Sequence, residues 1–195
     1  MKRLIMLIVC LAIVGGASAK GTPNSDNFSF GVKAGLNVSG MLMESYNPKT
    51  KAGFHIGLVS EYKFTDRFAI APELLYSSQG FSSKDGDYKL RMKSNYLNIP
   101  LLARFYIIDA LSVELGPQLG FNLGMKEKTI IYGDSGSEKI EKSDYNLFEF
   151  AIGLGATYNY KMFFASARYN IGLTNVIKEE KNKNSVFQFS VGCKF

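Results

Sequence analysis

The sequence is poor in the residues on which many enzymes and small secreted proteins depend. It has one histidine, His55, no tryptophan and two cysteines, Cys10 and Cys193, among 195 residues. Cys10 lies in an N-terminal apolar run, so the rest of the chain holds one cysteine and forms no internal disulfide. Metal-ligand spacings, phosphate-binding glycine loops and nucleophile elbows are missing from the sequence. We therefore expect no cofactor, no metal and no catalytic residue.

Long hydrophobic runs are also scarce. The apolar run at residues 4–14 follows Lys2 and Arg3 and precedes small residues that end in Ala17-Ser18-Ala19. The run is far shorter than the ~20 residues of a membrane-spanning helix. A basic end, a short apolar run and an A-x-A site are typical of a secretory signal peptide. We expect residues 1–19 to be cleaved, residues 20–27 to form a flexible lead-in, and residues 28–195 to form one domain.

The excess of positive charge is mild. The formal net charge of +6 falls to +4 when Lys2 and Arg3 leave with the signal peptide. Basic residues are not clustered and interleaved with aromatic residues, as nucleic-acid binding requires. We therefore expect no nucleic-acid partner, although the charge excess also suits anionic lipid headgroups.

Strict alternation of residue type is what the sequence has in abundance. In residues 111–124, LSVELGPQLGFNLG, the odd positions are large and apolar and the even positions are small or polar. Neighbouring residues of a strand point to opposite faces, so this segment predicts a strand with one apolar and one polar face. The same pattern recurs in residues 28–39, 52–64, 68–77, 96–107, 148–160, 163–173 and 187–195.

The connections between these segments alternate in length. Turns of a few residues at 65–67, 108–110 and 161–162 alternate with polar loops at 40–51, 80–94, 125–144 and 175–185. This rhythm is typical of outer-membrane barrels, which have short periplasmic turns and longer extracellular loops. The sequence predicts an all-β fold, an eight-stranded antiparallel up-and-down transmembrane β-barrel with a polar, plugged lumen. An even number of strands puts both termini in the periplasm of a Gram-negative outer membrane.

Two positions predict local irregularities in the strands. Pro72 has no N–H to donate and predicts a bulge or an unpaired position. The apolar residues Tyr88, Leu90 and Met92 are even-numbered, whereas those of 96–107 are odd-numbered. We expect a bulge near residues 94–95 and a hairpin that continues beyond the membrane.

A water-soluble eight-stranded barrel is the alternative fold, and it packs its bulky residues inward. Here the other face is rich in glycine, which suits a narrow lumen better than a solvated surface. Aromatic residues also fall near both ends of the predicted strands, where amphipathic rings meet a membrane interface. Both features favour lipid on the outside.

Ionisable residues on the inward face are expected to form a charge network. They are Lys33, Glu61, Lys63, Glu73, Arg104, Glu114, Glu149, Arg168 and Lys194. A lone buried charge is costly, so these residues should pair. The turn at 108–110 places Arg104 opposite Glu114 on the adjacent strand, and the turn at 161–162 places Gly155 beside Arg168. We interpret the network as a plug, with a proton or solute path as the alternative.

The segments YLNIPLLARFY (96–106), LGPQLGFNLG (115–124), ARYNIGLTN (167–175) and FQFSVGCKF (187–195) resemble the PorT-like outer-membrane β-barrel family of Bacteroidota. The resemblance implies an eight-stranded barrel similar in build to the OmpA and OmpX barrels. It also implies that the terminal aromatic residue, Phe195, is the signal read by the barrel-assembly machinery during insertion. A link to type IX secretion is implied by this resemblance alone.

Three functions remain open at this stage. The first is a non-enzymatic structural or interaction role in outer-membrane lipid, with a protein partner bound through loops 80–94 and 125–144 by strand addition. The second is a lipid-modifying enzyme that uses His55 as a base near Ser39 or Ser60. The third is a narrow solute channel. The first is the function we expect.

Overall fold

The computed structural model describes residues 27–43, 49–85, 88–131, 134–139, 145–176 and 182–195. The predicted signal peptide and nearly all of the lead-in lie outside these ranges. Within the described ranges there are nine strands: β1 Phe28–Met43, β2 Lys49–Lys63, β3 Phe68–Asp85, β4 Tyr88–Ile108, β5 Leu111–Ile131, β6 Asp134–Lys139, β7 Phe148–Tyr160, β8 Phe163–Gly172 and β9 Asn182–Lys194. No helix within the described ranges is long and apolar enough to cross a membrane.

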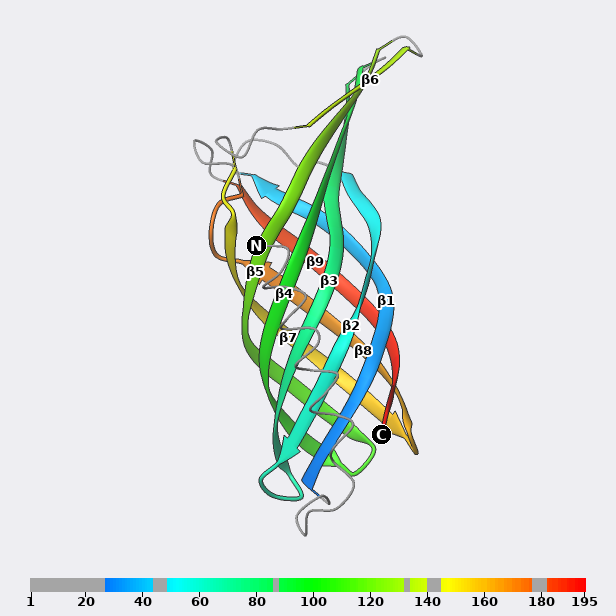
Figure 1. Cartoon of the computed structure of the whole chain (residues 1–195), viewed down its shortest axis with the longest axis vertical. Helices are drawn as coiled ribbons and strands as arrows, with labels where there is room; N and C mark the ends of the chain where they lie inside the picture. The colour runs from blue at the N-terminus through cyan, green and yellow to red at the C-terminus, as the bar shows by residue number, and fades with distance from the viewer. Residues whose placement is uncertain (1–26, 44–48, 86–87, 132–133, 140–144, 177–181) are drawn as a thin grey trace, which may run out of the picture.

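Eight of the nine strands close into a barrel (Figure 1). Strands β1 to β5 pair in sequence order, β5 then pairs with β7, and β7, β8 and β9 follow. Strand β9 returns to pair with β1, which closes the ring. All of these pairings are antiparallel. Strand β6 stands outside the ring and pairs with β5. The predicted fold, a closed eight-stranded antiparallel barrel, is confirmed.

Several strands continue beyond the barrel wall at one end. Residues 80–85 and 88–94 form the upper parts of β3 and β4, which is the continuation of the hairpin that the alternation of residues 88–92 predicted. The register of these two strands continues without a shift from Phe68↔Phe105 to Asp85↔Tyr88. Residues 125–144 were expected to be a loop, but they contain the end of β5 and all of β6. Each extension is stable as a strand because its backbone groups form hydrogen bonds with a neighbouring strand. The extensions of β3, β4 and β5, together with β6, project from one end of the barrel (Figure 1). We call them the projecting sheet.

The bulky apolar side chains face outward. Leu36 is 64% exposed, Leu154 60% and Val191 66%, whereas the inward side chains of Asn37, Ser77 and Asn98 are fully buried. Soluble proteins rarely expose apolar surface over a whole face. Apolar residues outside and polar residues inside are the arrangement of a barrel in a bilayer. This orientation is the one that the glycine-rich polar face predicted.

Aromatic rings lie on the outside near both ends of the barrel. At the end that carries the projecting sheet, the rings of Phe54 and Tyr76 are 5.9 Å apart, and those of Phe121 and Phe148 are 5.8 Å apart. At the short-turn end, the rings of Phe64 and Phe68 are 5.8 Å apart. Aromatic belts of this kind mark the two interfaces of a membrane barrel.

The predicted register slip occurs, but on the neighbouring strand. Residue Asn95 pairs with Gly124 and Tyr96 pairs with Asn122, so the additional residue is Leu123 of β5. Strand β4 alternates without interruption, and its Met92 points inward. Around Pro72 the pairing of β2 with β3 is interrupted without a change of register. Pro72 therefore marks a position that is unpaired with β2 rather than a bulge, and on its other side it pairs with Leu101 of β4.

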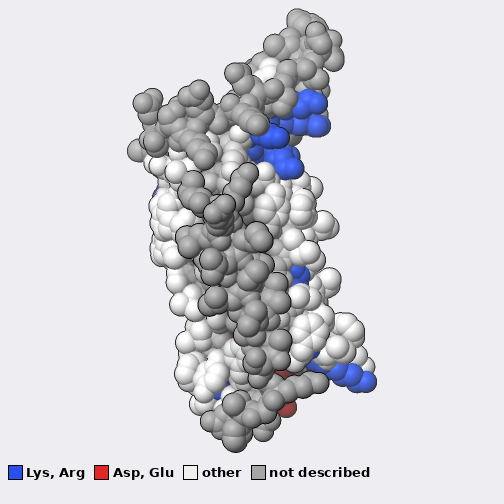
Figure 2. Space-filling model, in the orientation of Figure 1, with Lys and Arg blue, Asp and Glu red and all other residues white. Residues whose placement is uncertain are grey.

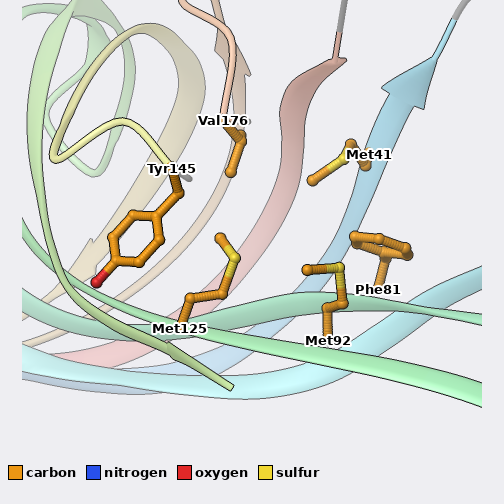
Figure 3. Close-up of a cluster of buried hydrophobic side chains, with 6 residues drawn as sticks. All are labelled: Met41, Phe81, Met92, Met125, Tyr145 and Val176. Carbon is orange, nitrogen blue, oxygen red and sulfur yellow. The ribbon is translucent and has the colours of Figure 1, made fainter. Parts of the chain in front are cut away.

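An apolar cluster explains why Met92 points inward. Six buried side chains are in contact inside the barrel, at the end of the barrel that carries the projecting sheet (Figure 3): Met41, Phe81, Met92, Met125, Tyr145 and Val176. They come from β1, β3, β4 and β5 and from the segments beside β7 and β8. The polar lumen is thus covered at this end by an apolar layer, which we call the apolar cap. The alternation of the sequence gave no sign of it, because apolar residues there were assigned to the outer face.

Candidate functional site

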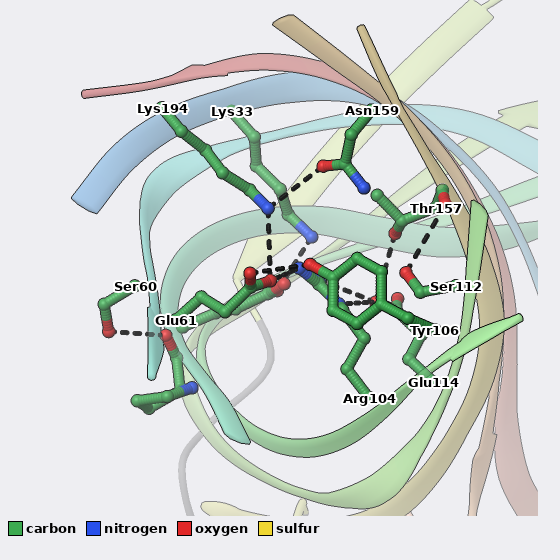
Figure 4. A network of polar contacts seen from close by, with 12 residues as sticks. Lys33, Ser60, Glu61, Arg104, Tyr106, Ser112, Glu114, Thr157, Asn159 and Lys194 are labelled. Atoms are coloured by element: carbon green, nitrogen blue, oxygen red, sulfur yellow. Dashed lines mark hydrogen bonds and ion pairs between the residues drawn. The ribbon is translucent and has the colours of Figure 1, made fainter. Parts of the chain in front are cut away.

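The lumen of the barrel contains the candidate site residues, since strand alternation points them inward. Near the short turns, seven of these side chains form a continuous series of ion pairs across the barrel, and Figure 4 shows the part of it around Glu61, Arg104 and Glu114. In order, the series is Lys33, Glu73, Arg168, Glu114, Arg104, Glu61 and Lys194. Positive and negative groups alternate along it, so every charge has a neighbour of opposite sign. We call it the ion-pair chain.

The guanidinium groups hold the centre of the ion-pair chain. Arg168 donates from Nη1 and Nη2 to the two carboxylate oxygens of Glu73, both at 2.8 Å, and from Nε to Glu114 at 2.8 Å. Arg104 donates from Nη2 to Glu114 at 2.8 Å, which forms the pair predicted from the turn. Thr157 adds a hydroxyl donor to Glu114 at 3.1 Å. Paired guanidinium–carboxylate contacts are among the stronger hydrogen bonds in proteins, and these fix five strands to one another.

Glycine makes room for one of these arginines. Gly155 lies opposite Arg168 in the pairing of β7 with β8, as predicted. A Cβ atom on Gly155 would lie 2.7 Å from the carbonyl oxygen of Ala167 and 3.1 Å from the Cα of Arg168. A larger residue at this position would therefore displace the strand that carries Arg168.

Two residues predicted to join the network do not. Lys63 ends β2 and lies half-exposed at the short-turn mouth, with its ammonium 4.5 Å from the ring centroid of Tyr106. At the mouth it keeps water, so it needs no carboxylate. Glu149 is buried, yet it forms no ion pair with any residue that the structure describes. No inward cation lies on the strands next to it at its level.

Around Glu149 the lumen is polar but poorly paired. The Oε2 atom of Glu149 and both amide atoms of Asn98 find no hydrogen-bond partner among the described residues. The same holds for single amide atoms of Gln118, Asn122 and Asn170. Asn98, Gly120 and Glu149 follow one another across β4, β5 and β7. We call Asn98, Gln118, Asn122, Glu149 and Asn170 the unpaired cluster.

His55 lies between these two regions and is held at both ring nitrogens. Its Nδ1 is 2.7 Å from Asn37 Oδ1 and its Nε2 is 2.8 Å from Ser190 Oγ. Neither Ser39 nor Ser60, the serines close to it in sequence, is its partner, because they bond to backbone oxygens of Gly80 and Pro72. Ser190 is 135 residues away, and no sequence signal joins the two.

The order Ser190, His55, Asn37 is that of a catalytic triad, but the surroundings are not those of an active site. Ser190 is 6% exposed, His55 1% and Asn37 0%. Asn37 is also held by Gln188, Ser77 and the backbone of β2 and β3. A serine nucleophile must reach its substrate, and this one is enclosed by packed side chains. The arrangement serves to cross-link β1, β2 and β9.

The interior leaves little room for a solute. A cavity beside Glu73, Arg104 and Phe164 measures about 10 Å³, which is space for about one water molecule. A wider depression of about 460 Å³ opens at the short-turn mouth, where Lys63, Tyr106 and Phe195 contribute to its wall. Among the described residues, no three His, Cys, Asp or Glu side chains are placed to hold a metal ion. Side chains of the described residues thus occupy most of the interior next to the ion-pair chain.

The comparisons with known proteins agree with this architecture. The family model described as "Outer membrane protein beta-barrel domain" matches residues 19–178. No curated protein sequence gives a significant match.

Solved structures give the same picture of the fold. Ail, the attachment invasion locus protein of Yersinia pestis, is similar with a TM-score of 0.51 and 18% identity over 87% of this chain and 99% of Ail. A second structure of Ail, in complex with the heparin analogue sucrose octasulfate, has a TM-score of 0.53 and 20% identity over 87% of this chain and 99% of Ail. Neisserial surface protein A is similar with a TM-score of 0.54 and 14% identity over 85% of this chain and 97% of that protein.

Proposed function

Because the chain belongs to the outer-membrane β-barrel domain family, we propose that it is a non-enzymatic outer-membrane protein with an interaction role. It presents the projecting sheet outside the cell and binds a protein partner there. The observation that carries this proposal is the sheet itself, which extends beyond a barrel whose interior is filled. The functional surface is thus on the exterior of the molecule.

The edge of the projecting sheet supplies the binding mode. Strand β6 pairs with β5 along Asp134–Lys139, and its other edge has no strand beside it among the described residues. An open edge presents unpaired N–H and C=O groups, and an extended segment of a partner adds to such an edge by backbone hydrogen bonds. This proposal assigns the partner site to β6 rather than to the whole of loops 80–94 and 125–144.

The orientation in the membrane follows from the same asymmetry. Long strand extensions belong to the outside of outer-membrane barrels and short turns to the periplasm. Both ends of the barrel domain, Phe28 and Phe195, lie at the short-turn end, where the backbone of Phe195 donates to the Phe30 carbonyl at 2.7 Å. We therefore assign both termini to the periplasm, where Phe195 is accessible to the barrel-assembly machinery. The narrower PorT-like identity and its link to secretion stay predictions.

Crosslinking in intact cells tests the partner site. A photoreactive residue at Ser135 or Ser137 of β6 is expected to capture a protein, whereas the same residue at exposed Thr65 in the short turn is not. Proline at Ser135 and Ser137 removes backbone donors and should lower capture from neighbouring β6 positions at least fivefold. Equal capture at Thr65, or capture that the prolines leave unchanged, would contradict the proposal.

Two measurements separate this function from its alternatives. In planar bilayers the purified protein is expected to show no single-channel conductance, because ion pairs and the apolar cap fill its lumen. The Ser190–His55–Asn37 arrangement is the observation that favours a lipid-modifying enzyme. Cells that carry His55→Gln should keep the lipid composition of the wild type, and a changed acyl-chain profile would support the enzyme instead.

A further inference from the structure

A basic patch lies on the outward face of β4 and β5, at the base of the projecting sheet. Arg91 and Lys93 of β4 lie opposite Lys128 and Lys126 of β5, and all four side chains are exposed. Figure 2 shows Lys and Arg gathered at the base of the projection, above the largely uncharged wall of the barrel. We call these four residues the basic patch.

The charges of the basic patch repel one another, and no carboxylate whose side chain the structure describes neutralises them. Like charges placed directly opposite on adjacent strands destabilise a sheet. None of the four forms an ion pair with a carboxylate in the part of the chain that the structure describes. On the flanking strand β3, the residues paired with Arg91 and Lys93 are Ser82 and Gly80, which carry no charge. An external anion placed between the four cations would remove this repulsion.

The height of the basic patch indicates where that anion comes from. Tyr76, Leu97 and Phe121 are paired across β3, β4 and β5 and lie in the aromatic belt. Lys93 precedes Leu97 by four residues in β4 and lies nearer the projecting sheet. Four residues span about 13 Å along a strand, which is about 10 Å along the membrane normal for a strand tilted by ~40°. Headgroups extend roughly 5–8 Å beyond the hydrocarbon on each side, and lysine stems bend toward that layer. The ammonium groups of Lys93 and of Lys126, which lies opposite it, therefore reach the level of lipid phosphates, and Arg91 and Lys128 lie two residues further from the hydrocarbon.

Below the basic patch, beyond Asn95 of β4, the surface becomes apolar. Leu123 is 46% exposed at the bulge of β5, and Leu97 of β4 is paired with Phe121, the next outward residue of β5. An amphiphile with a phosphate above and acyl chains below matches both surfaces at once. A soluble polyanion matches only the basic patch and leaves the leucines without a partner. Charge and apolar surface together favour a lipid.

From this geometry we propose that Arg91, Lys93, Lys126 and Lys128 bind the phosphate groups of an outer-leaflet lipid, whose acyl chains cover Leu97 and Leu123. The bound lipid neutralises the base of the projecting sheet and fixes its orientation to the membrane surface. The site is separate from the β6 edge, so it stands whether or not a protein partner binds there.

Lipid titration with the purified barrel tests the site. The protein in dodecyl maltoside micelles is titrated with diphosphoryl lipid A and with the same lipid after removal of its phosphates, and bound lipid is counted by native mass spectrometry. The test variant is Lys93→Gln with Lys126→Gln. The matched control is Arg67→Gln with Lys183→Gln. Both cations are exposed; Arg67 lies in a short turn at the opposite end of the barrel from the basic patch, and Lys183 lies on β9, which pairs with neither β4 nor β5. Both variants change the charge equally, and heat-dependent gel mobility reports that each is folded.

The expected result is a preference for the phosphorylated lipid of at least tenfold in Kd. This preference should disappear in the test variant and persist in the control. The single variant Lys126→Gln should lose about half of the preference on a logarithmic scale, which gives a second reading from a smaller change. Unchanged binding by the test variant overturns the proposal. So does inositol hexaphosphate, a soluble polyanion, if it binds the basic patch as tightly as the lipid.

Discussion

The two halves of the lumen differ in the partners that they provide for a buried carboxylate. In the ion-pair chain, Glu114 is 1% exposed and receives hydrogen bonds from Arg104, Arg168 and Thr157. In the unpaired cluster, Glu149 is 5% exposed and its Oε2 atom has no partner among the described residues. Both glutamates are inward residues of neighbouring strands, so burial alone does not distinguish them. The partners that other strands bring to each carboxylate make the difference, and this predicts opposite responses to the same substitution.

The largest effect is expected from Arg168→Ala. It leaves the carboxylates of Glu73 and Glu114 with fewer donors in a buried site, and such a break costs about 3–5 kcal/mol. Urea unfolding in lipid vesicles, followed by circular dichroism, measures the loss of unfolding free energy. Arg67→Ala in the exposed turn is the control and should stay within about 0.5 kcal/mol of wild type. Equal effects of the two substitutions would show that the ion-pair chain contributes nothing to stability.

Glu114→Gln is expected to have the next largest effect. Glutamine keeps the shape of the side chain but removes the charge that Arg104 and Arg168 share. The loss should be about 1.5–3 kcal/mol, the range for hydrogen bonds to charged groups. The same unfolding assay gives the value, and adding Arg168→Ala to Glu114→Gln should cost less than the two changes separately because they share one interaction. Strict additivity would argue against the coupled chain.

Two glycine substitutions compare the space in each half. A Cβ on Gly155 meets backbone atoms of β8 at 2.7 and 3.1 Å, whereas a Cβ on Gly120 meets side-chain atoms of Asn98 and Glu149 at 3.0 Å or more. Gly155→Ala should therefore cost about 1–3 kcal/mol through overpacking, and Gly120→Ala clearly less. The midpoint of thermal unfolding ranks the two. The reverse order would mean that the unpaired cluster is the more tightly packed half.

The smallest effect, and the one of opposite sign, is expected from Glu149→Gln. It removes a buried charge that has no ion-pair partner among the described residues, so the free energy of unfolding should rise, by about 1 kcal/mol. Glu114→Gln serves as the matched control for Glu149→Gln, because both variants replace a buried glutamate by glutamine. Destabilisation by Glu149→Gln as large as that by Glu114→Gln would show that Glu149 has a partner of equal strength.

The sequence alone determined which face of each strand is apolar in the barrel wall, the number of strands in the barrel, and two contacts that lie across short turns. Arg104 with Glu114 and Gly155 with Arg168 were accessible because a short turn fixes the register of its two strands. Tertiary structure decided the rest: the contacts of Arg168 with Glu73 and of His55 with Ser190, the lack of an ion pair at Glu149 among the described residues, and the apolar cap. These contacts join residues far apart in the chain, and they depend on how the strands tilt and stagger as the barrel closes. Alternation records which way a side chain points but not what it meets on the opposite wall.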